Sequence, residues 1–208
     1  MTSQQWPRLV LASGSRTRAR ILAEAGLTFE VAVSGVDESL PAGRHAFEAV
    51  AELARRKAEA VAGQFMGSLV LGCDSMLEVE GDALGKPGSA AVVLTTWRRL
   101  CGRNAILYTG HCLVDTRNRR TLVETVGTTV RFGQPDEAEL LAYASTAEAL
   151  EMAGSFSLEG RGGAFIEGIH GDPNNVRGLS LPALRRLLDM VGVPITSLWS
   201  TGPGSSSR

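Results

Sequence analysis

The start of the fold is decided by residues 9–18, which are Leu9-Val10-Leu11-Ala12-Ser13-Gly14-Ser15-Arg16-Thr17-Arg18. The four apolar residues predict a short buried strand, and the Ser-Gly-Ser triplet breaks it. A helical pattern follows to about residue 25, with Ser15 as its N-cap and Gly26 as its stop. Alternation over residues 29–34 predicts a second strand. The chain therefore opens with strand, tight loop, helix and strand, a βαβ-like start.

Further along, helical and extended patterns continue to alternate. Apolar residues recur at helical spacing over 46–61, and Lys57 falls on the flank of this stripe. There its stem can pack while its amine reaches an adjacent cleft. Residues 69–74 predict a buried strand that ends in Asp74. The other expected elements are a hairpin extension over 76–79 turning at 81–82, a helix over 89–100, β segments near 105–115 and 121–132, a helix from 135, a strand at 164–166 and a helix over 181–190.

Composition limits the class of protein. The 208 residues are 44% hydrophobic, which excludes wholesale disorder. With 21 Lys and Arg against 22 Asp and Glu, the net charge of −1 argues against a general nucleic-acid binder but leaves small phosphorylated ligands open. We expect one domain or two tightly joined lobes over 1–195. Residues 196–208, rich in Ser, Gly, Thr and Pro, predict a flexible tail.

The cysteines and the apolar runs bear on the compartment. Cys73, Cys101 and Cys112 are odd in number and widely spaced, so they predict neither a disulfide framework nor a structural zinc site. No run of 18 apolar residues is present, and the apolar run after Arg8 is too short for a signal segment. We therefore expect a cytoplasmic protein with no membrane partner.

A candidate anion site lies where the first strand gives way to the first helix. Backbone N–H groups at a helix start, the hydroxyls of Ser13 and Ser15, and the guanidinium of Arg18 all suit phosphate oxygens. The alternative is a capped surface helix whose arginines are solvated.

The Gly81–Pro87 loop invites comparison with a phosphate-binding Walker A loop. It fails that comparison, because three residues separate its glycines instead of four and Pro87 stands where Ser or Thr would reach magnesium. Lys86 can still contact a phosphate from a turn, although it could also be an ordinary loop lysine.

Acidic residues follow two of the expected strands. Glu38, next to Asp37, comes after one strand, and Asp74 ends another. Carboxylates at such positions serve as Mg²⁺ ligands or general bases. Because burying Asp74 without a partner would be costly, it is the more informative of them. A capping or turn role is the alternative.

Other chemistries have little support. His45, His111 and His170 are scattered without metal-ligand spacing, there is no G-x-S-x-G elbow, and the tryptophans are not interleaved with basic runs.

Nine short segments together resemble the Maf family of nucleoside triphosphate pyrophosphatases, over roughly residues 8 to 193. In chain order they are Leu11–Arg18, Val36–Glu38, Leu53–Ala58, Gly72–Ser75, Gly85–Pro87, Tyr108–Gly110, Ala153–Phe156, Asp172–Asn174 and Gly178–Pro182.

The resemblance implies an α/β fold with an elongated mixed β-sheet, flanking helices and two lobes around a deep cleft. It implies metal-dependent cleavage between the α and β phosphates of non-standard or pyrimidine nucleoside triphosphates, giving a nucleoside monophosphate and pyrophosphate. Asp74 matches the general base, and Glu38 the second acidic residue; both would hold Mg²⁺ or Mn²⁺. A homodimer is also implied. The residues that match the phosphate-contacting set are Ser13, Ser15, Arg18, Lys57 and Lys86.

Two departures from the family pattern concern the substrate. Arg16 stands where the family usually has proline, and the base-discriminating positions carry Thr17, Ser75 and Glu159. Members acting on dTTP and UTP tend to carry arginine, threonine and glutamine there; those acting on 7-methyl-GTP tend to carry tryptophan, glutamine and glutamate. Glu159 favours the donor edge of guanine, but Thr17 gives a cationic ring no aromatic partner.

Two other function classes stay open at this point. One is a nucleotide-binding regulator of septum formation with little turnover, against which the intact acidic and basic residues argue. The other is a phosphosugar or phosphatase enzyme on a similar sheet, which would release orthophosphate instead of pyrophosphate.

Overall fold

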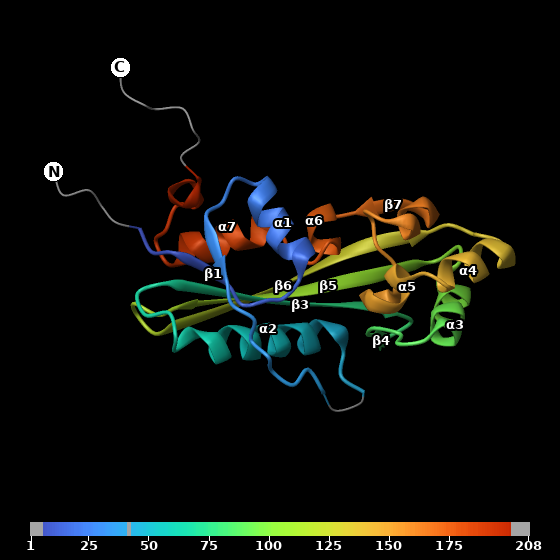
Figure 1. The fold of residues 1–208 in the computed structure, drawn as a ribbon, viewed down its shortest axis with the longest axis horizontal. Coiled ribbons are helices and arrows are strands. Elements are labelled where there is room, and N and C mark those ends of the chain that lie inside the picture. Colours follow the sequence, from blue (N-terminus) through green and yellow to red (C-terminus); the bar gives the residue numbers. More distant parts are fainter. Residues whose placement is uncertain (1–5, 41–42, 201–208) are drawn as a thin grey trace, which may run out of the picture.

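A mixed seven-stranded sheet organises the chain in the computed structural model, which describes residues 6–40 and 43–200 (Figure 1). The strand order is β2-β1-β3-β5-β6-β7, and β4 pairs with β3. β1 pairs in parallel with β2 and β3, and the other pairings are antiparallel. The strands are β1 Leu9–Leu11, β2 Phe29–Val31, β3 Leu69–Val79, β4 Asp82–Leu84, β5 Asn104–Asp115, β6 Arg120–Phe132 and β7 Ile166–His170.

Helices cover both faces of this sheet. In Figure 1, α2 lies along one face, α1 and α7 lie on the other, and α3, α4 and α5 gather with β4 at the far end. The helices are α1 Arg16–Glu24, α2 Ala46–Ala62, α3 Ala90–Leu100, α4 Glu137–Ala144, α5 Ala147–Glu151, α6 Pro173–Val176 and α7 Leu181–Met190, with 3₁₀ turns at Ala153–Ser155, Arg161–Phe165 and Ile195–Leu198. The mixed sheet and flanking helices confirm the expected fold class.

Three apolar clusters divide the molecule into two lobes. In the first lobe, Leu22 and Leu187 pack α1 and α7 on one sheet face, and Ala54 packs α2 on the other. In the second lobe, Trp97 of α3 makes edge contacts with Phe132, whose ring centroid lies 5.5 Å away. The long strands β3, β5 and β6 contribute to both, so they hold the lobes together.

Two glycines allow α2 to lie unusually close to the sheet. A Cβ atom on Gly72 would come within 2.2 Å of the Ala54 carbonyl oxygen, and one on Gly110 within 2.3 Å of the Val50 carbonyl oxygen. Any larger residue would therefore meet the helix backbone itself. The close approach places Lys57, which is buried on the sheet-facing side of α2, against β3.

Strand β3 runs unbroken through Asp74 into the extension expected over 76–79, and this changes the position of Asp74. Asp74 lies in the middle of the strand, which runs on to Val79 because β5 pairs with it as far as Glu78. On the other edge, β1 pairs with β3 only as far as Leu71, and β4 pairs with it only from Leu77 onward. The expectation that Asp74 ends a strand was wrong. The strand that ends near Asp74 is its neighbour β1, whose pairing stops at Leu71.

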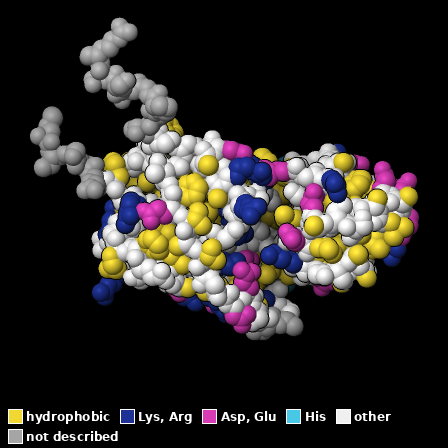
Figure 2. All heavy atoms as spheres, in the orientation of Figure 1, with side chains coloured by type: hydrophobic (Ala, Val, Ile, Leu, Met, Phe, Trp, Pro, Cys, Tyr) yellow, Lys and Arg dark blue, Asp and Glu magenta, His cyan; other side chains and the backbone are white. Residues whose placement is uncertain are grey.

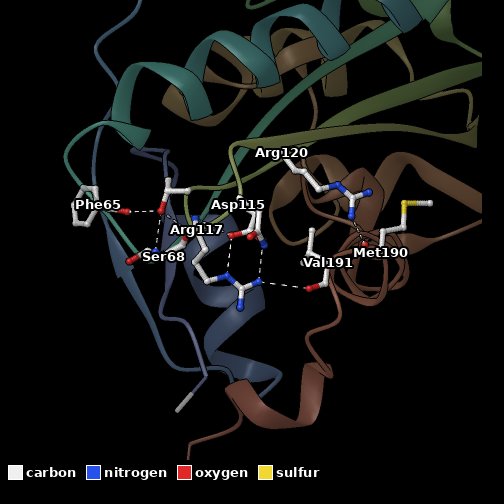
Figure 3. Close-up of polar contacts among 9 residues, drawn as sticks. Phe65, Ser68, Asp115, Arg117, Arg120, Met190 and Val191 are labelled. Atoms are coloured by element: carbon white, nitrogen blue, oxygen red, sulfur yellow. Dashed lines mark hydrogen bonds and ion pairs between the residues drawn. The ribbon is translucent and has the colours of Figure 1, made fainter. Parts of the chain in front are cut away.

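The turn between β5 and β6 fixes the end of α7 (Figure 3). The buried carboxylate of Asp115 accepts hydrogen bonds from the backbone N–H and the guanidinium of Arg117, at 2.8 to 3.0 Å. The same guanidinium donates to the Val191 carbonyl oxygen at 3.4 Å, and Arg120 donates to the Met190 carbonyl oxygen at 3.0 Å. These arginines satisfy carbonyl groups that a helix end leaves without partners.

Two expected elements differ in the structure. The strand expected at 164–166 was wrong: a 3₁₀ turn occupies Arg161–Phe165, because Glu148 accepts hydrogen bonds from two N–H groups of this turn, and β7 begins only at Ile166. Residues 196–200, expected to begin the tail, pack on the first lobe: Leu198 is buried and Trp199 bridges to Leu27. Residues 201–208 lie outside the described part.

Over the described residues, no helix combines the length and apolarity needed to cross a membrane.

Candidate active site

A cleft of about 1180 Å³ lies between the two lobes. Figure 2 shows basic and acidic side chains gathered around a hollow between a larger and a smaller part of the molecule. The cleft opens beside the stretch of β3 that neither β1 nor β4 covers. Its lining includes the predicted residues Ser13, Ser15, Thr17, Arg18, Glu38, Lys57, Asp74, Ser75 and Lys86, and also Arg16.

The acidic and basic centre of the cleft is formed by Asp74, Lys57 and Glu38. The Lys57 ammonium nitrogen lies 2.6 Å from Asp74 Oδ1 and 2.8 Å from Glu38 Oε1. The side chains of Lys57 and Asp74 are each 8% exposed, whereas that of Glu38 is 57% exposed. One buried cation therefore links a buried carboxylate to one that faces the cleft. The buried pair satisfies Asp74, as its burial requires.

The two neighbouring acids Asp37 and Glu38 have different surroundings. The Ser39 hydroxyl and the Ser39 backbone N–H both donate to the Asp37 carboxylate, and the hydroxyl contributes most to lowering the pKa of that carboxyl. Asp37 thus stabilises a local turn, and Glu38 alone faces Lys57.

The start of α1 brings hydroxyls and a guanidinium together at the edge of the cleft. Ser15 caps the helix by accepting a hydrogen bond from the Arg18 backbone N–H at 3.4 Å, as expected. Ser13 Oγ accepts from the Ser15 backbone N–H and from the Arg18 guanidinium, both at 3.2 Å. The loop and helix start are therefore held in one shape, with Arg18 buried against it.

Lys86 is exposed on the loop that follows β4 and lines the cleft opposite α1. This loop is tied to the second lobe by a hydrogen bond of 3.2 Å from the Gly154 backbone N–H to the Gly85 carbonyl oxygen. Positive charge thus reaches the cleft from both lobes.

The three predicted specificity residues do not share one wall. Thr17 and Ser75 line the cleft, while Glu159 is not among the lining residues. The Glu159 carboxylate makes ion pairs with Arg20 and with Arg177. Arg177 does line the cleft, and sequence reasoning missed it: its partner Glu24 lies 153 residues away in the chain, so no spacing pattern marks the pair.

Arg177 is the centre of a charge network between α1 and the second lobe. Besides Glu159, its guanidinium contacts Glu24 at 2.9 Å and donates to the Asn174 side-chain oxygen at 2.8 Å. Two arginines and two glutamates, Arg20 and Arg177 with Glu24 and Glu159, thus balance one another.

His111 takes no part in the cleft. It is buried in the first lobe, where its Nε2 accepts a hydrogen bond of 2.8 Å from the Ser180 backbone N–H at the start of α7. Burial lowers the pKa of His111 to about 4, so the ring is neutral at pH 7. Its role is structural, which agrees with the absence of metal-ligand spacing among the histidines.

The donor set suits a divalent cation that is shared with a substrate. Glu38 and Asp74 contact the same ammonium, so both carboxylates face one point in the cleft. No group of three or more His, Cys, Asp or Glu residues within 6–40 and 43–200 forms a complete cage. Mg²⁺ fits such a site, because it commonly takes one or two carboxylates together with phosphate oxygens and water.

Comparison with known proteins gives close relatives along nearly the whole chain. A "Nucleoside triphosphate pyrophosphatase" of Streptomyces avermitilis is 48% identical over 202 residues, covering 96% of this chain and 98% of the relative. Proteins of the same name from Salinispora tropica and Synechococcus elongatus are 47% and 46% identical, and they cover 96% and 94% of this chain, and 93% and 98% of the relatives. The Staphylococcus aureus Ham1 structure is a distant likeness, with 16% identity and a TM-score of 0.42 over 73% of this chain and 88% of that one.

The family comparison agrees with the motifs. Residues 8–191 match the family described as "Maf-like protein". This range is most of the chain, and it includes every cleft residue named above. The resemblance drawn from nine short segments is confirmed, and the chain belongs to the Maf family.

Proposed function

We propose that this protein hydrolyses the bond between the α and β phosphates of nucleoside triphosphates, giving a nucleoside monophosphate and pyrophosphate. The observation that carries the proposal is the contact of buried Asp74 with Lys57 in a cleft that also holds the Ser13–Arg18 helix start. The names of the relatives support the same activity.

In the proposed reaction, Asp74 accepts a proton from a water molecule as the water oxygen bonds to the α-phosphorus. The bridging oxygen then leaves with pyrophosphate, and Arg18 and Lys86 stabilise the charge that develops on it. Lys57 holds the Asp74 carboxylate in place through the 2.6 Å contact. Because these groups are positioned before the substrate binds, little reorganisation is needed during the reaction.

A divalent cation, Mg²⁺ or Mn²⁺, would be held by Glu38 and Asp74. When bound, it would neutralise charge on the phosphate oxygens. Glu38 is well placed for this because it is exposed to the cleft, whereas Asp74 is anchored in the sheet.

For the base, we propose non-standard or pyrimidine triphosphates in preference to 7-methyl-GTP. The Glu159 carboxylate is already paired with two arginines, so its charge is balanced and is not free to favour a cationic ring. Thr17 supplies no aromatic surface for that ring to stack on.

The test measures pyrophosphate and orthophosphate released from UTP, dTTP, CTP and 7-methyl-GTP with Mg²⁺ or Mn²⁺ and with EDTA. Asp74→Asn keeps the shape of the side chain and removes the base, so kcat should fall by about 10² to 10⁴-fold. A matched control is Asp82→Asn, an exposed carboxylate paired with Arg99 outside the cleft, which should keep wild-type activity.

Equal activity of the wild type and Asp74→Asn would overturn the catalytic assignment. Orthophosphate as the first product would indicate a phosphatase instead. Tight nucleotide binding without any product would favour the regulatory alternative.

A further inference from the structure

A chain of hydrogen bonds runs from Arg18 at the cleft into the interior of the sheet. The Arg18 guanidinium donates to Ser75 Oγ at 3.0 Å, and Ser75 Oγ lies 2.9 Å from Thr109 Oγ1. Thr109 Oγ1 in turn donates to the Asn175 carbonyl oxygen at 2.9 Å. Four residues from α1, β3, β5 and α6 are therefore linked in one line.

The direction of every hydrogen in this chain is fixed by its two ends. A guanidinium can only donate, and a carbonyl oxygen can only accept. If the Thr109 hydroxyl donated to Ser75 instead, no hydrogen would lie between Thr109 Oγ1 and the Asn175 carbonyl oxygen, and these two acceptor atoms would face each other at 2.9 Å. Thr109 must therefore donate to Asn175, and Ser75 must donate to Thr109.

The inner end of the chain is firmly anchored. Asn175 and Thr109 are both 0% exposed. The Asn175 side-chain nitrogen lies 3.1 Å from the Leu107 and Val126 carbonyl oxygens and 3.0 Å from Thr128 Oγ1, so its two hydrogens are shared among three acceptors. These contacts join α6 to β5 and β6, so the carbonyl group that receives the Thr109 hydrogen cannot move far.

We propose that Thr109 is a positioning residue for the reaction, acting through Ser75 on Arg18. The inference rests on the proposed function, in which Arg18 contacts the phosphates. Arg18 also donates to Ser13 Oγ and to the Gly178 carbonyl oxygen, and only the bond to Ser75 reaches the sheet that carries Asp74. Thr109 thereby fixes the place of the guanidinium relative to Asp74.

The fixed hydrogen direction also limits what Ser75 can offer a ligand. Its hydrogen is committed to Thr109, and one lone pair accepts from Arg18. Toward the cleft Ser75 has only a lone pair left, so it accepts a hydrogen bond from a hydroxyl or amino group of the nucleotide and does not donate to a phosphate.

The test compares Thr109→Val, which keeps the shape and removes the hydroxyl, with Thr109→Ser, which keeps the hydroxyl. For Thr109→Val we expect kcat/KM with UTP to fall by about tenfold or more, because small errors in the position of a catalytic group are costly. Thr109→Ser should recover most of the activity. Thr96→Val is the matched control, since Thr96 is a buried threonine of α3 outside this chain of bonds.

A double-mutant cycle separates positioning from packing. If Thr109 acts through Ser75, Thr109→Val should cause no further loss in a Ser75→Ala background. Losses that multiply would overturn the proposal, as would wild-type kinetics of Thr109→Val.

Binding of the α,β-methylene analogue of UTP, measured by calorimetry, provides a readout that does not need turnover. A weaker affinity of Thr109→Val than of the wild type is expected, and an equal affinity would overturn the positioning role. A wild type that binds the analogue but never releases pyrophosphate would contradict only the proposed function. If Thr109→Val does not fold, Ser75→Ala tests the same link from the cleft side, and unchanged kinetics and affinity in that variant would equally overturn the proposal.

Discussion

Replacing Gly110 with alanine tests whether the close approach of α2 to the sheet builds the active site. The added Cβ would lie 2.3 Å from the Val50 carbonyl oxygen and 2.8 Å from the Ala51 backbone nitrogen. Both atoms belong to the backbone of α2, so no side-chain rotation relieves the contact. The helix must retreat by about 1 Å to restore an ordinary van der Waals distance.

That retreat has two consequences, one for stability and one for the rate. Overpacking at a buried position costs about 1 to 3 kcal/mol of unfolding free energy. Lys57 moves with α2, and a 1 Å displacement would stretch its 2.6 Å contact with Asp74 beyond hydrogen-bonding distance. Since a 1 Å misplacement can cost about 10²-fold in rate, we expect kcat to fall by about that factor in a protein that still folds.

Urea unfolding followed by circular dichroism gives the stability change, and pyrophosphate release gives kcat. Gly63→Ala is the matched control: Gly63 ends the same helix, its φ is −63°, and nothing lies within 4 Å of an added Cβ. This control should be as stable as the wild type or slightly more stable. A Gly110→Ala protein with wild-type stability and wild-type kcat would refute the reasoning.

Three further predictions concern pH, the β5–β6 turn and the charge network. Because burial lowers the pKa of His111 from 6.5 to about 4, the unfolded chain binds the proton first as pH falls, so stability decreases from pH 6.5 toward pH 4 by up to about 3 kcal/mol. His111→Gln should flatten this slope in urea titrations between pH 4 and 7, and an unchanged slope would contradict it. Asp115→Ala leaves the N–H groups of Arg117 without their acceptor and should lower the unfolding free energy by about 1 to 3 kcal/mol. Because the turn lies outside the cleft, kcat should not change, and a fall in kcat would contradict this separation of the turn from the site. Glu159→Gln breaks two partly exposed ion pairs, so its stability cost should stay below about 1 kcal/mol. The change also leaves the positive charge of Arg177, which lines the cleft, less balanced, so it should disfavour the cationic ring and raise the ratio of kcat/KM for UTP over 7-methyl-GTP; a constant ratio would remove Glu159 from base selection.

Elements with strong periodicity could be predicted from the sequence. The stripe over 46–61 corresponds to α2, observed at Ala46–Ala62, and the final helix lies at Leu181–Met190 as expected. The short helices α5 and α6, of five and four residues, carry too little periodicity to be seen. The extension of β3 over 76–79 was expected from its local pattern, whereas the unbroken pairing of β3 with β5 through Asp74 depends on a distant strand.

The same distinction holds for the candidate site: local spacing predicts some of its residues, and only the fold places the others. Lys57 could be placed beside a cleft because its position on a helical stripe follows from spacing alone. Its contact with Asp74 additionally requires the two glycines that admit α2 to the sheet, and their effect appears only once the strands are paired. Arg177 and Thr109 act through partners 153 and 66 residues away, Glu24 and the carbonyl of Asn175, so only the folded chain identifies them.

The stretch of β3 from Gly72 to Met76, which neither β1 nor β4 covers, has a consequence for solubility as well as for chemistry. An uncovered strand edge presents unpaired N–H and C=O groups, and a long one templates the addition of a foreign strand, which leads to aggregation. Here the open edge is short, is closed at both ends by neighbouring strands, and carries the charge of Asp74 beside Lys57. The gap is too short to pair with a long foreign strand, so strand addition at this edge is disfavoured, while the side chains of Asp74 and Ser75 still line the cleft.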